Sequence, residues 1–261
     1  MTLITVTFRD RSGLIDTCQS IFKQQIRADD FEHIVVDGGS NDGSREWYLD
    51  NRPKAGNFAI ISESDGGIYD AMNKGIGLAS GDFVCFLNSG DVFHDDLALG
   101  FVASKLEEGD ADWSYGRANI VDARGEKVRP AVGVLPYSLR RHLLGRAVIC
   151  HQAVWMRRAL LEELGGFDER FGAAADYHLL LRAAAVSMPH AWDRILVDYL
   201  AGGVSDTDVY RQLLRRHRAR VDAMRYGNLA ASLDWCWTAG QVPYIALRKS
   251  AKRLVGGART S

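Results

Sequence analysis

Three carboxylates of the chain each follow a strand-like segment and stand beside glycine, namely Asp37, Asp65 and Asp91. If these segments are parallel strands of one sheet, their carboxyl ends meet at one edge, which is where open α/β sheets bind ligands. Carboxylates accept hydrogen bonds from ribose hydroxyls or base N–H groups, while glycine-rich turns and a hard cation can hold a diphosphate. The repetition indicates a site for a nucleotide and a divalent cation, although any one of these residues alone is equally typical of a turn or helix N-cap.

The elements that would position these carboxylates are visible in the hydrophobic pattern. Short apolar and β-branched runs predict strands over residues 3–8, 31–37, 58–63 and 83–87. Apolar residues at helical spacing predict helices over residues 14–22, through Trp47 and Leu49, and over 68–79. Strands that alternate with helices imply right-handed βαβ units and a parallel sheet. The first 92 residues therefore predict an α/β arrangement with the carboxylates along a single edge.

The pattern is looser after residue 92. Helices are predicted over residues 97–108, over 158–164, from Asp176 onward, and over 208–226. Strands are predicted over residues 112–121, 126–129, 148–156 and 191–200. His151 and Gln152 interrupt the third of these strands, and residues 140–144 are expected to form a loop or a short helix.

The composition is typical of a soluble globular protein, with 261 residues, of which 47% are hydrophobic and 25% charged. No apolar run reaches the roughly 18 residues that a membrane-spanning helix needs, and Met1 leads directly into a strand-like segment. We therefore expect no signal peptide, no spanning segment and a cytoplasmic location. The four cysteines are widely spaced without a C-x-x-C pair, which favours reduced structural thiols over a disulfide framework or a zinc site.

The charge is unevenly distributed. Residues 208–261 contain eleven Lys and Arg against three Asp, a balance of +8, and since the whole chain has −1, residues 1–207 have −9. A basic segment on an acidic body suggests contact with an anionic surface, and Trp235, Trp237 and Tyr244 among the basic residues suit a membrane surface. The alternative is a solvated helix face that packs on the rest of the protein.

Several common motifs are incomplete. The glycines from Gly75 to Gly81 contain one residue too many for a dinucleotide fingerprint and follow a predicted helix rather than a strand. The sequence has no G-x-x-x-x-G-K-[ST] phosphate loop, and the glycine after Ser40 is one position too late for a nucleophile elbow. Dehydrogenase, P-loop and α/β-hydrolase chemistries are therefore disfavoured.

Five segments taken together carry a family resemblance. They are residues 35–44 (VVDGGSNDGS), 65–76 (DGGIYDAMNKGI), 81–91 (GDFVCFLNSGD), 151–152 (HQ) and 176–177 (DY). In this order, over roughly residues 1–205, they resemble the family-two inverting glycosyltransferases of GT-A fold, with the closest likeness to bacterial exopolysaccharide enzymes of the colanic acid type.

The resemblance implies a fold and a division of the chain. The fold is α/β, of the nucleotide-diphospho-sugar transferase-like (Rossmann-like) type, with a mostly parallel sheet flanked by helices. Residues 1–92 would form the nucleotide-binding half and residues 93–207 the acceptor half of the GT-A domain, followed by a basic helical extension over residues 208–261.

The resemblance also implies a UDP- or GDP-sugar donor, a divalent metal (Mn²⁺ or Mg²⁺) and transfer with inversion at the anomeric carbon. By position, Thr7, Arg9 and Asp37 would hold the nucleoside. Asp65 and Lys74 would lie near the ribose and the diphosphate.

Asp91 takes the place of the metal carboxylate in this resemblance, and Asp176 that of the general base. Inverting transfer is one displacement at an acetal carbon, so it needs a carboxylate to take the proton of the acceptor hydroxyl and a cation on the departing diphosphate. At a helix N-terminus Asp176 is expected to stay ionised at neutral pH, and its bland alternative is a plain N-cap. His151 and Gln152 are assigned to the acceptor or the diphosphate, although a lone histidine in an apolar strand is more often a core group.

Two positions depart from the family pattern. The first acidic position of the metal motif is Asn88 or Ser89 here, so metal affinity would rest on Asp91, the diphosphate and water. Ala175 stands where the family often has Glu before the base, which leaves a contact to the acceptor or donor sugar unassigned.

The sequence thus predicts an inverting glycosyltransferase of bacterial surface polysaccharide biosynthesis. It would act on a polyprenyl-diphosphate-linked or oligosaccharide acceptor at the inner face of the membrane, with no nucleic acid partner. The alternatives are a non-catalytic nucleotide-sugar binding protein and a nucleotidyltransferase, which would release pyrophosphate.

Overall fold

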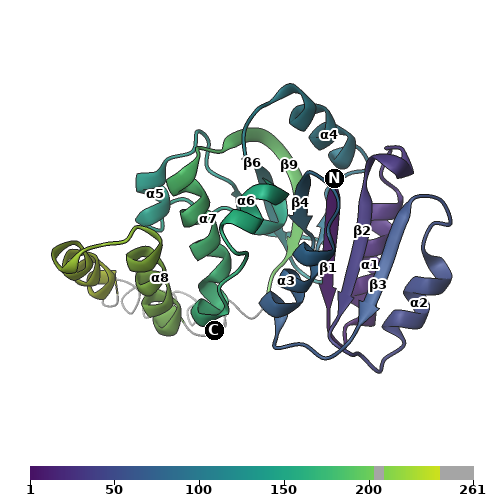
Figure 1. Cartoon of the computed structure of the whole chain (residues 1–261), viewed down its shortest axis with the longest axis horizontal. Helices are drawn as coiled ribbons and strands as arrows, with labels where there is room; N and C mark the ends of the chain where they lie inside the picture. Colours follow the sequence, from purple (N-terminus) through teal and green to yellow (C-terminus); the bar gives the residue numbers. More distant parts are fainter. Residues whose placement is uncertain (203–208, 242–261) are drawn as a thin grey trace, which may run out of the picture.

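The computed structural model describes residues 1–202 and 209–241. Within this part of the chain, strands form one mixed nine-stranded sheet with helices on both faces (Figure 1). The strands are β1 (Thr2–Thr7), β2 (Glu32–Asp37), β3 (Asn57–Ser62), β4 (Phe83–Phe86), β5 (Val92–Phe93), β6 (Trp113–Val121), β7 (Lys127–Val132), β8 (Val154–Arg157) and β9 (His190–Leu200).

The α-helices are α1 (Arg11–Phe22), α2 (Ser44–Asn51), α3 (Ile68–Leu78), α4 (Ala98–Glu108), α5 (Leu139–Leu143), α6 (Arg158–Glu163), α7 (Ala175–Val186) and α8 (Val209–Ala223), and residues 228–241 are also helical. Short 3-10 helices are η1 (Ala28–Asp30), η2 (His151–Ala153) and η3 (Glu169–Ala174).

The strand order is β3-β2-β1-β4-β8-β6-β9-β5, with β7 paired to β6. The first four strands are parallel, as predicted, whereas β8 runs antiparallel to both of its neighbours. The register places Thr7 opposite Asp37, and Asp37 opposite Ser62, so the carboxyl ends of β1, β2 and β3 are level. The α/β fold with helices flanking the sheet is therefore confirmed, but the sheet is mixed rather than mostly parallel, because β5, β7 and β8 pair only with antiparallel neighbours.

Apolar clusters lie on the two faces of the sheet, because its central strands are buried on both sides. One cluster includes residues of α3, α6 and α7, and the other includes residues of α1, α2 and α4. Helix α3 lies very close to β1: a β-carbon at Gly75 would be 2.6 Å from Cγ2 of Ile4. Glycine at this position therefore allows α3 to pack closely against β1.

Some elements differ from those predicted. The strand expected over residues 148–156 is wrong in its first part, because His151 and Gln152 lie in the 3-10 turn η2 and only β8 continues as a strand. The two-residue strand β5 was not predicted, and residues 140–144 largely form the short helix α5. The start of the helix predicted over residues 208–226 lies outside the described residues.

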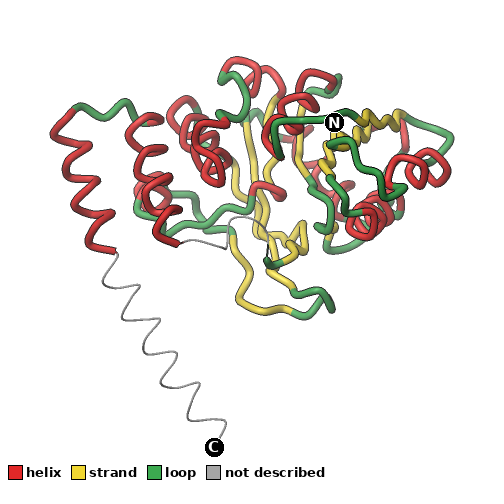
Figure 2. The backbone as a smooth tube through the Cα atoms, turned by 90° about the horizontal axis from the view of Figure 1, so that it is seen from below, coloured by secondary structure: helices red, strands yellow, loops and turns green. Residues whose placement is uncertain are grey.

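The described part of the basic segment packs on the domain. Helix α8 contacts α7 and η3, and the helix over residues 228–241 lies alongside α8 (Figure 2). Arg220 of α8 donates to Asp234 at 2.7 Å, which joins these two helices. Residues 242–261, with Tyr244 and the remaining basic residues, lie outside the described part. A search of the described residues finds no helix long and apolar enough to cross a membrane.

Candidate active site

The loops at the carboxyl ends of β1, β2 and β3 are tied together. The backbone N–H of Arg9 donates to Oγ of Ser40 at 2.7 Å, which joins the loop after β1 to the loop after β2. A β-carbon at Gly38 would lie 2.7 Å from Oδ2 of Asp65, so the loop after β3 lies against the backbone of the loop after β2. The structure therefore brings Arg9, Asp37 and Asp65 to one edge.

Asp37 lies behind this edge rather than on its surface. Its side chain is fully buried and accepts hydrogen bonds from the backbone N–H and hydroxyl of Ser40 and from the hydroxyl of Ser62. Beside it, Oγ1 of Thr7 is buried and makes no hydrogen bond to any described residue. Arg9 is exposed, with its guanidinium 5.0 Å from the ring centre of Phe8. Asp37 thus shapes the loop, while Thr7 and Arg9 retain unused donors.

Asp65 and Lys74 lie on either side of the glycine-rich loop that leads into α3. Oδ1 of Asp65 accepts from the backbone N–H of Gly67 at 2.9 Å. The Lys74 ammonium pairs with Glu63 at 3.0 Å and with Asp70 at 3.4 Å, and these contacts, that to Glu63 foremost, raise its pKa. Lys74 therefore lies beside the loop of Asp65, with its charge already matched by neighbouring acids.

Asp91 is buried, with only 4% of the residue exposed. Its Oδ2 accepts from Nε2 of Gln152 at 2.9 Å, and its Oδ1 accepts from the backbone N–H of Leu200 at 2.9 Å. Burial raises the pKa of this carboxyl to about 7, against the opposing effect of the two hydrogen bonds and of His151. Asp91 therefore joins three distant parts of the chain.

This donor set does not fit a metal ion. Both oxygens of Asp91 already accept hydrogen bonds in a nearly closed environment, and a cation on Oδ2 would have to displace the amide of Gln152. Among the residues that the structure describes, no group of three or more His, Cys, Asp and Glu side chains converges. Divalent hard cations take six or more oxygen ligands, so Asp91 alone is a poor cage.

Asp176 and His151 form a pair beside the end of β4. Asp176 is the second residue of α7, its side chain is 29% exposed, and its Oδ2 lies 3.5 Å from Nδ1 of His151. The other ring nitrogen of His151 lies 3.5 Å from Nδ2 of Asn88, whose buried Oδ1 has no hydrogen-bond partner among the described residues. His151 is therefore half-buried between Asp176 and Asn88, and not enclosed in the core.

The environment keeps Asp176 ionised. Desolvation would raise the pKa of its carboxyl, but the hydrogen bond and the charge of His151, the backbone N–H of Tyr177 and the charge of Arg216 together lower it. The pKa values of Asp176 and Asp91 thus move in opposite directions. The ionised carboxylate of Asp176 is suited to accept a proton. The carboxyl of Asp91 instead keeps its proton up to about neutral pH.

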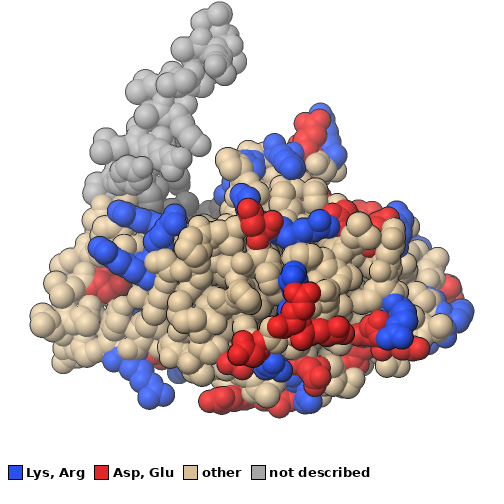
Figure 3. Space-filling view, turned by 90° about the horizontal axis from the view of Figure 1, so that it is seen from above, with Lys and Arg blue, Asp and Glu red and all other residues tan. Residues whose placement is uncertain are grey.

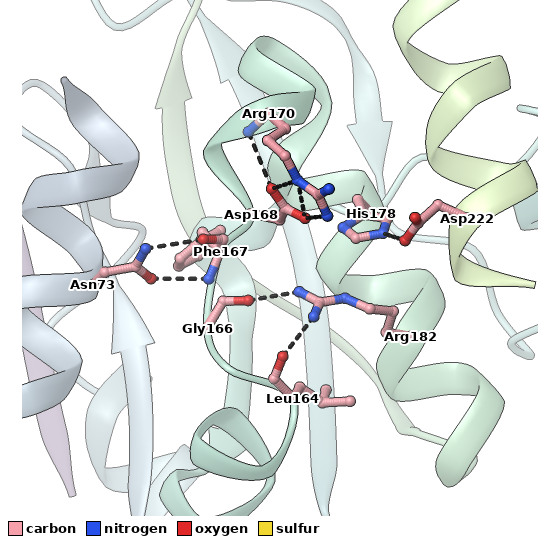
Figure 4. A network of polar contacts seen from close by, with 9 residues as sticks. All are labelled: Asn73, Leu164, Gly166, Phe167, Asp168, Arg170, His178, Arg182 and Asp222. Atoms are coloured by element: carbon pink, nitrogen blue, oxygen red, sulfur yellow. Dashed lines mark hydrogen bonds and ion pairs between the residues drawn. The ribbon is translucent and has the colours of Figure 1, made fainter. Parts of the chain in front are cut away.

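A network of polar contacts positions the segment that leads into Asp176 (Figure 4). Asn73 of α3 makes two hydrogen bonds with the backbone of Phe167, at 2.9 and 2.8 Å. Arg182 of α7 donates to the carbonyls of Leu164 and Gly166, at 2.5 and 2.6 Å. The turn after α6 is therefore fixed to α3 on one side and to α7 on the other.

The same network extends to α8. Nε2 of His178, two residues after Asp176 on α7, lies 2.8 Å from Oδ2 of Asp222 on α8. Tyr69, in the first turn of α3, is a further neighbour of Asp176, since its pKa is raised by burial and by the charge of Asp176. Asn73, Tyr69 and Arg182 cannot be singled out from the sequence, because their spacing on helices is also that of ordinary surface and core positions.

Comparison with known proteins gives the family. The family model described as Glycosyl transferase family 2 matches residues 2–165. An uncharacterised glycosyltransferase of Mycobacterium tuberculosis is 38% identical over 208 residues, which cover 78% of this chain and 76% of that protein. A PGL/p-HBAD biosynthesis glycosyltransferase of Mycobacterium bovis is 34% identical over 194 residues, which cover 72% of each chain.

A solved structure shares the fold at low identity. The mannosyltransferase PcManGT from Pyrobaculum calidifontis, in complex with GDP-Man and Mn²⁺, has a TM-score of 0.60 and 19% identity, with 99% of this chain and 79% of that chain covered. This likeness shows a GT-A-like fold. Since the family model covers more than half of the chain and both relatives exceed 30% identity, the chain belongs to glycosyl transferase family 2 and is a nucleotide-sugar-dependent glycosyltransferase.

Proposed function

We propose that this glycosyltransferase transfers a sugar with inversion from a UDP- or GDP-sugar to a polyprenyl-diphosphate-linked or oligosaccharide acceptor in surface glycoconjugate biosynthesis. The observation that carries the proposal is the ionised carboxylate of Asp176, partly open to solvent and paired with His151. The likeness to a PGL/p-HBAD biosynthesis enzyme supports the class of product.

Asp176 would act as the general base. The acceptor hydroxyl oxygen attacks the anomeric carbon and gives its proton to a carboxylate oxygen of Asp176, while the bond from that carbon to the nucleotide diphosphate breaks. His151 favours the ionised form before the reaction, through the contact between its Nδ1 and Oδ2 of Asp176 at 3.5 Å. Asp176 then becomes neutral, and the departing nucleotide takes the electron pair of the broken bond.

We assign the nucleotide to the edge formed by the loops after β1, β2 and β3. Thr7 has a buried hydroxyl without a partner among the described residues, Arg9 has an exposed guanidinium, and Asp65 lies against the backbone of the next loop. Asp37 would act indirectly, because it fixes the position of Ser40. Lys74 would lie near the ribose and the diphosphate, where its ion pair with Glu63 fixes the loop after β3. These roles are proposals that binding measurements on single variants would test.

The structure of PcManGT is a complex with GDP-Man and Mn²⁺, which supports the expectation of a divalent cation for this chain. The environment of Asp91 does not fit one, so the proposed reaction uses only the side chains of this chain. The role of Asp91 as a metal carboxylate stays a prediction, and its titration, described in the Discussion, tests it.

The test of the general base is Asp176→Asn, which keeps the size of the side chain and removes its basicity. We expect the rate of sugar transfer to fall about 10²–10⁴-fold, the usual contribution of such a group, with unchanged affinity for UDP or GDP. Asp96→Asn, at an exposed position, is the matched control and should transfer normally. Unchanged transfer by Asp176→Asn would refute the base assignment, and a product with retained anomeric configuration would refute inversion.

A further inference from the structure

Helix α8 directs two arginines toward the region of Asp176, and neither forms an ion pair with a described residue. The guanidinium of Arg215 lies against Gly172, where a β-carbon would be 3.4 Å from its Cζ. The guanidinium of Arg216 lies 5.6 Å from the ring centre of Tyr177, the residue after Asp176. Both side chains are half-buried, and neither makes an ion pair or a hydrogen bond with any residue in the described ranges 1–202 and 209–241.

The other inward-facing charges around α8 are matched. Arg220 and His217 both bind Asp234, at 2.7 and 2.6 Å, and Asp222 binds His178 at 2.8 Å. Helix α8 thus combines satisfied ion pairs with two half-buried arginines that form no ion pair with any described residue. A partly buried cation without an anion is unfavourable unless a ligand supplies the opposite charge.

These arginines are also connected, through η3, to the glycine-rich loop after β3 that contains Asp65. In η3, Glu169 approaches the glycine-rich loop after β3, since a β-carbon at Gly66 would be 3.6 Å from its Oε2. Three residues later in the same turn, Gly172 contacts Arg215, and the positive φ of 51° at Gly172 suits glycine. The turn η3 therefore spans from the loop of Asp65 to the arginines of α8.

We propose that Arg215 and Arg216 form a binding site for the diphosphate group of a substrate, next to Asp176. Guanidinium groups bind phosphate oxygens through paired hydrogen bonds, and a diphosphate supplies the negative charge that would pair with these two arginines. Basic side chains are visible at the end of the molecule where α8 lies, while acidic side chains gather over the other half (Figure 3). The proposal rests on the proposed function only in taking the ligand to be a sugar donor or a lipid-linked acceptor, since both contain a diphosphate.

The test measures binding, not turnover. Titration calorimetry with inorganic pyrophosphate would compare the full-length protein with Arg215→Gln and Arg216→Gln, each of which removes one charge. We expect each variant to bind about tenfold to hundredfold more weakly, the usual effect of losing a charge-assisted hydrogen bond. Arg218→Gln is the matched control, because Arg218 has the same charge on the same helix but is exposed. Arg216→Lys, which keeps the charge, should recover part of the affinity.

Two soluble probes distinguish the source of the diphosphate. Weaker binding of UDP or GDP by Arg215→Gln and Arg216→Gln would assign the site to the donor, and weaker binding of farnesyl diphosphate alone would assign it to the acceptor. Equal loss in all three glutamine variants would reduce the effect to general charge and overturn the proposal, as would unchanged affinity in folded variants. Because no transfer is measured, these results are independent of whether Asp176 is the base.

Discussion

Replacement of Asp91 by Asn is the sharpest test of how the site is built. The carboxyl is buried against Gln152 and Leu200, and its pKa is raised from an ordinary 3.8 to about 7. Between these two values the folded chain keeps a proton that the unfolded chain releases. The stabilisation from this group is therefore complete below about pH 4 and is lost as the pH rises through about 7.

The size of the effect follows from that difference. Each pH unit in this window lowers the free energy of unfolding by about 1.4 kcal/mol, because the folded state binds one more proton than the unfolded state. The loss amounts to about 3 kcal/mol between pH 5 and pH 8. Asparagine does not titrate, so the free energy of unfolding of the native chain, minus that of Asp91→Asn, should fall by this amount over the same range.

Urea denaturation at several pH values measures this difference. Asp50→Asn is the control, because it removes an exposed carboxylate, and its difference from the native chain should stay constant. A constant difference for Asp91→Asn as well would refute the argument from burial. Repeating the series with Mn²⁺ and UDP tests the metal prediction, since a cation bound to Asp91 would keep the carboxylate ionised and abolish the pH dependence.

Three further variants test the arrangement around the base. In His151→Gln the pKa of Asp176 should rise, because the histidine lowers it, so the acidic limb of the pH–kcat profile should move to higher pH; a limb that stays in place would contradict the pairing. Asn73→Ala loses both hydrogen bonds to Phe167 and should lower the free energy of unfolding, measured in urea, by about 2 kcal/mol. Asn73→Asp can still accept from the N–H of Phe167, so its free energy of unfolding should lie between those of the native chain and Asn73→Ala. Gly172→Ala forces alanine into φ 51° and ψ −132°, at a cost of about 2 kcal/mol, and should lower Tm by about 4–8 °C; an unchanged Tm would show that the backbone is not constrained.

The first half of the fold was predictable because its elements are locally complete. Strands β1 to β4 are continuous apolar runs bounded by glycine and polar residues, and each pairs with a parallel neighbour. The loops after β2 and β3 were placed at one edge by the βαβ rule, and Gly38 and Asp65 do lie together there. Nothing beyond the periodicity of the sequence was needed for this part.

The region of His151 and Gln152 was not predictable in the same way. The apolar run from Val148 to Met156 favours a strand, but Gln152 is withdrawn into the turn η2, where its amide binds Asp91, 61 residues earlier. A local pattern contains no information about such a partner. The burial of Asp91 has the same origin, since Leu200 supplies the other hydrogen bond from a strand more than a hundred residues away.

The position of β9 has a consequence for how the protein folds while it is synthesised on the ribosome. This strand enters the sheet between β6 and β5, and its last residue binds Asp91, 109 residues before it in sequence. Contacts of such long range form late, because the chain between them must first be closed into a loop. While residues 1–190 are being synthesised, Asp91 lacks one of its two donors and β5 and β6 lack a neighbour. Open strand edges of this kind favour aggregation, so we expect chains that stop before β9 to be poorly soluble and to lack the site.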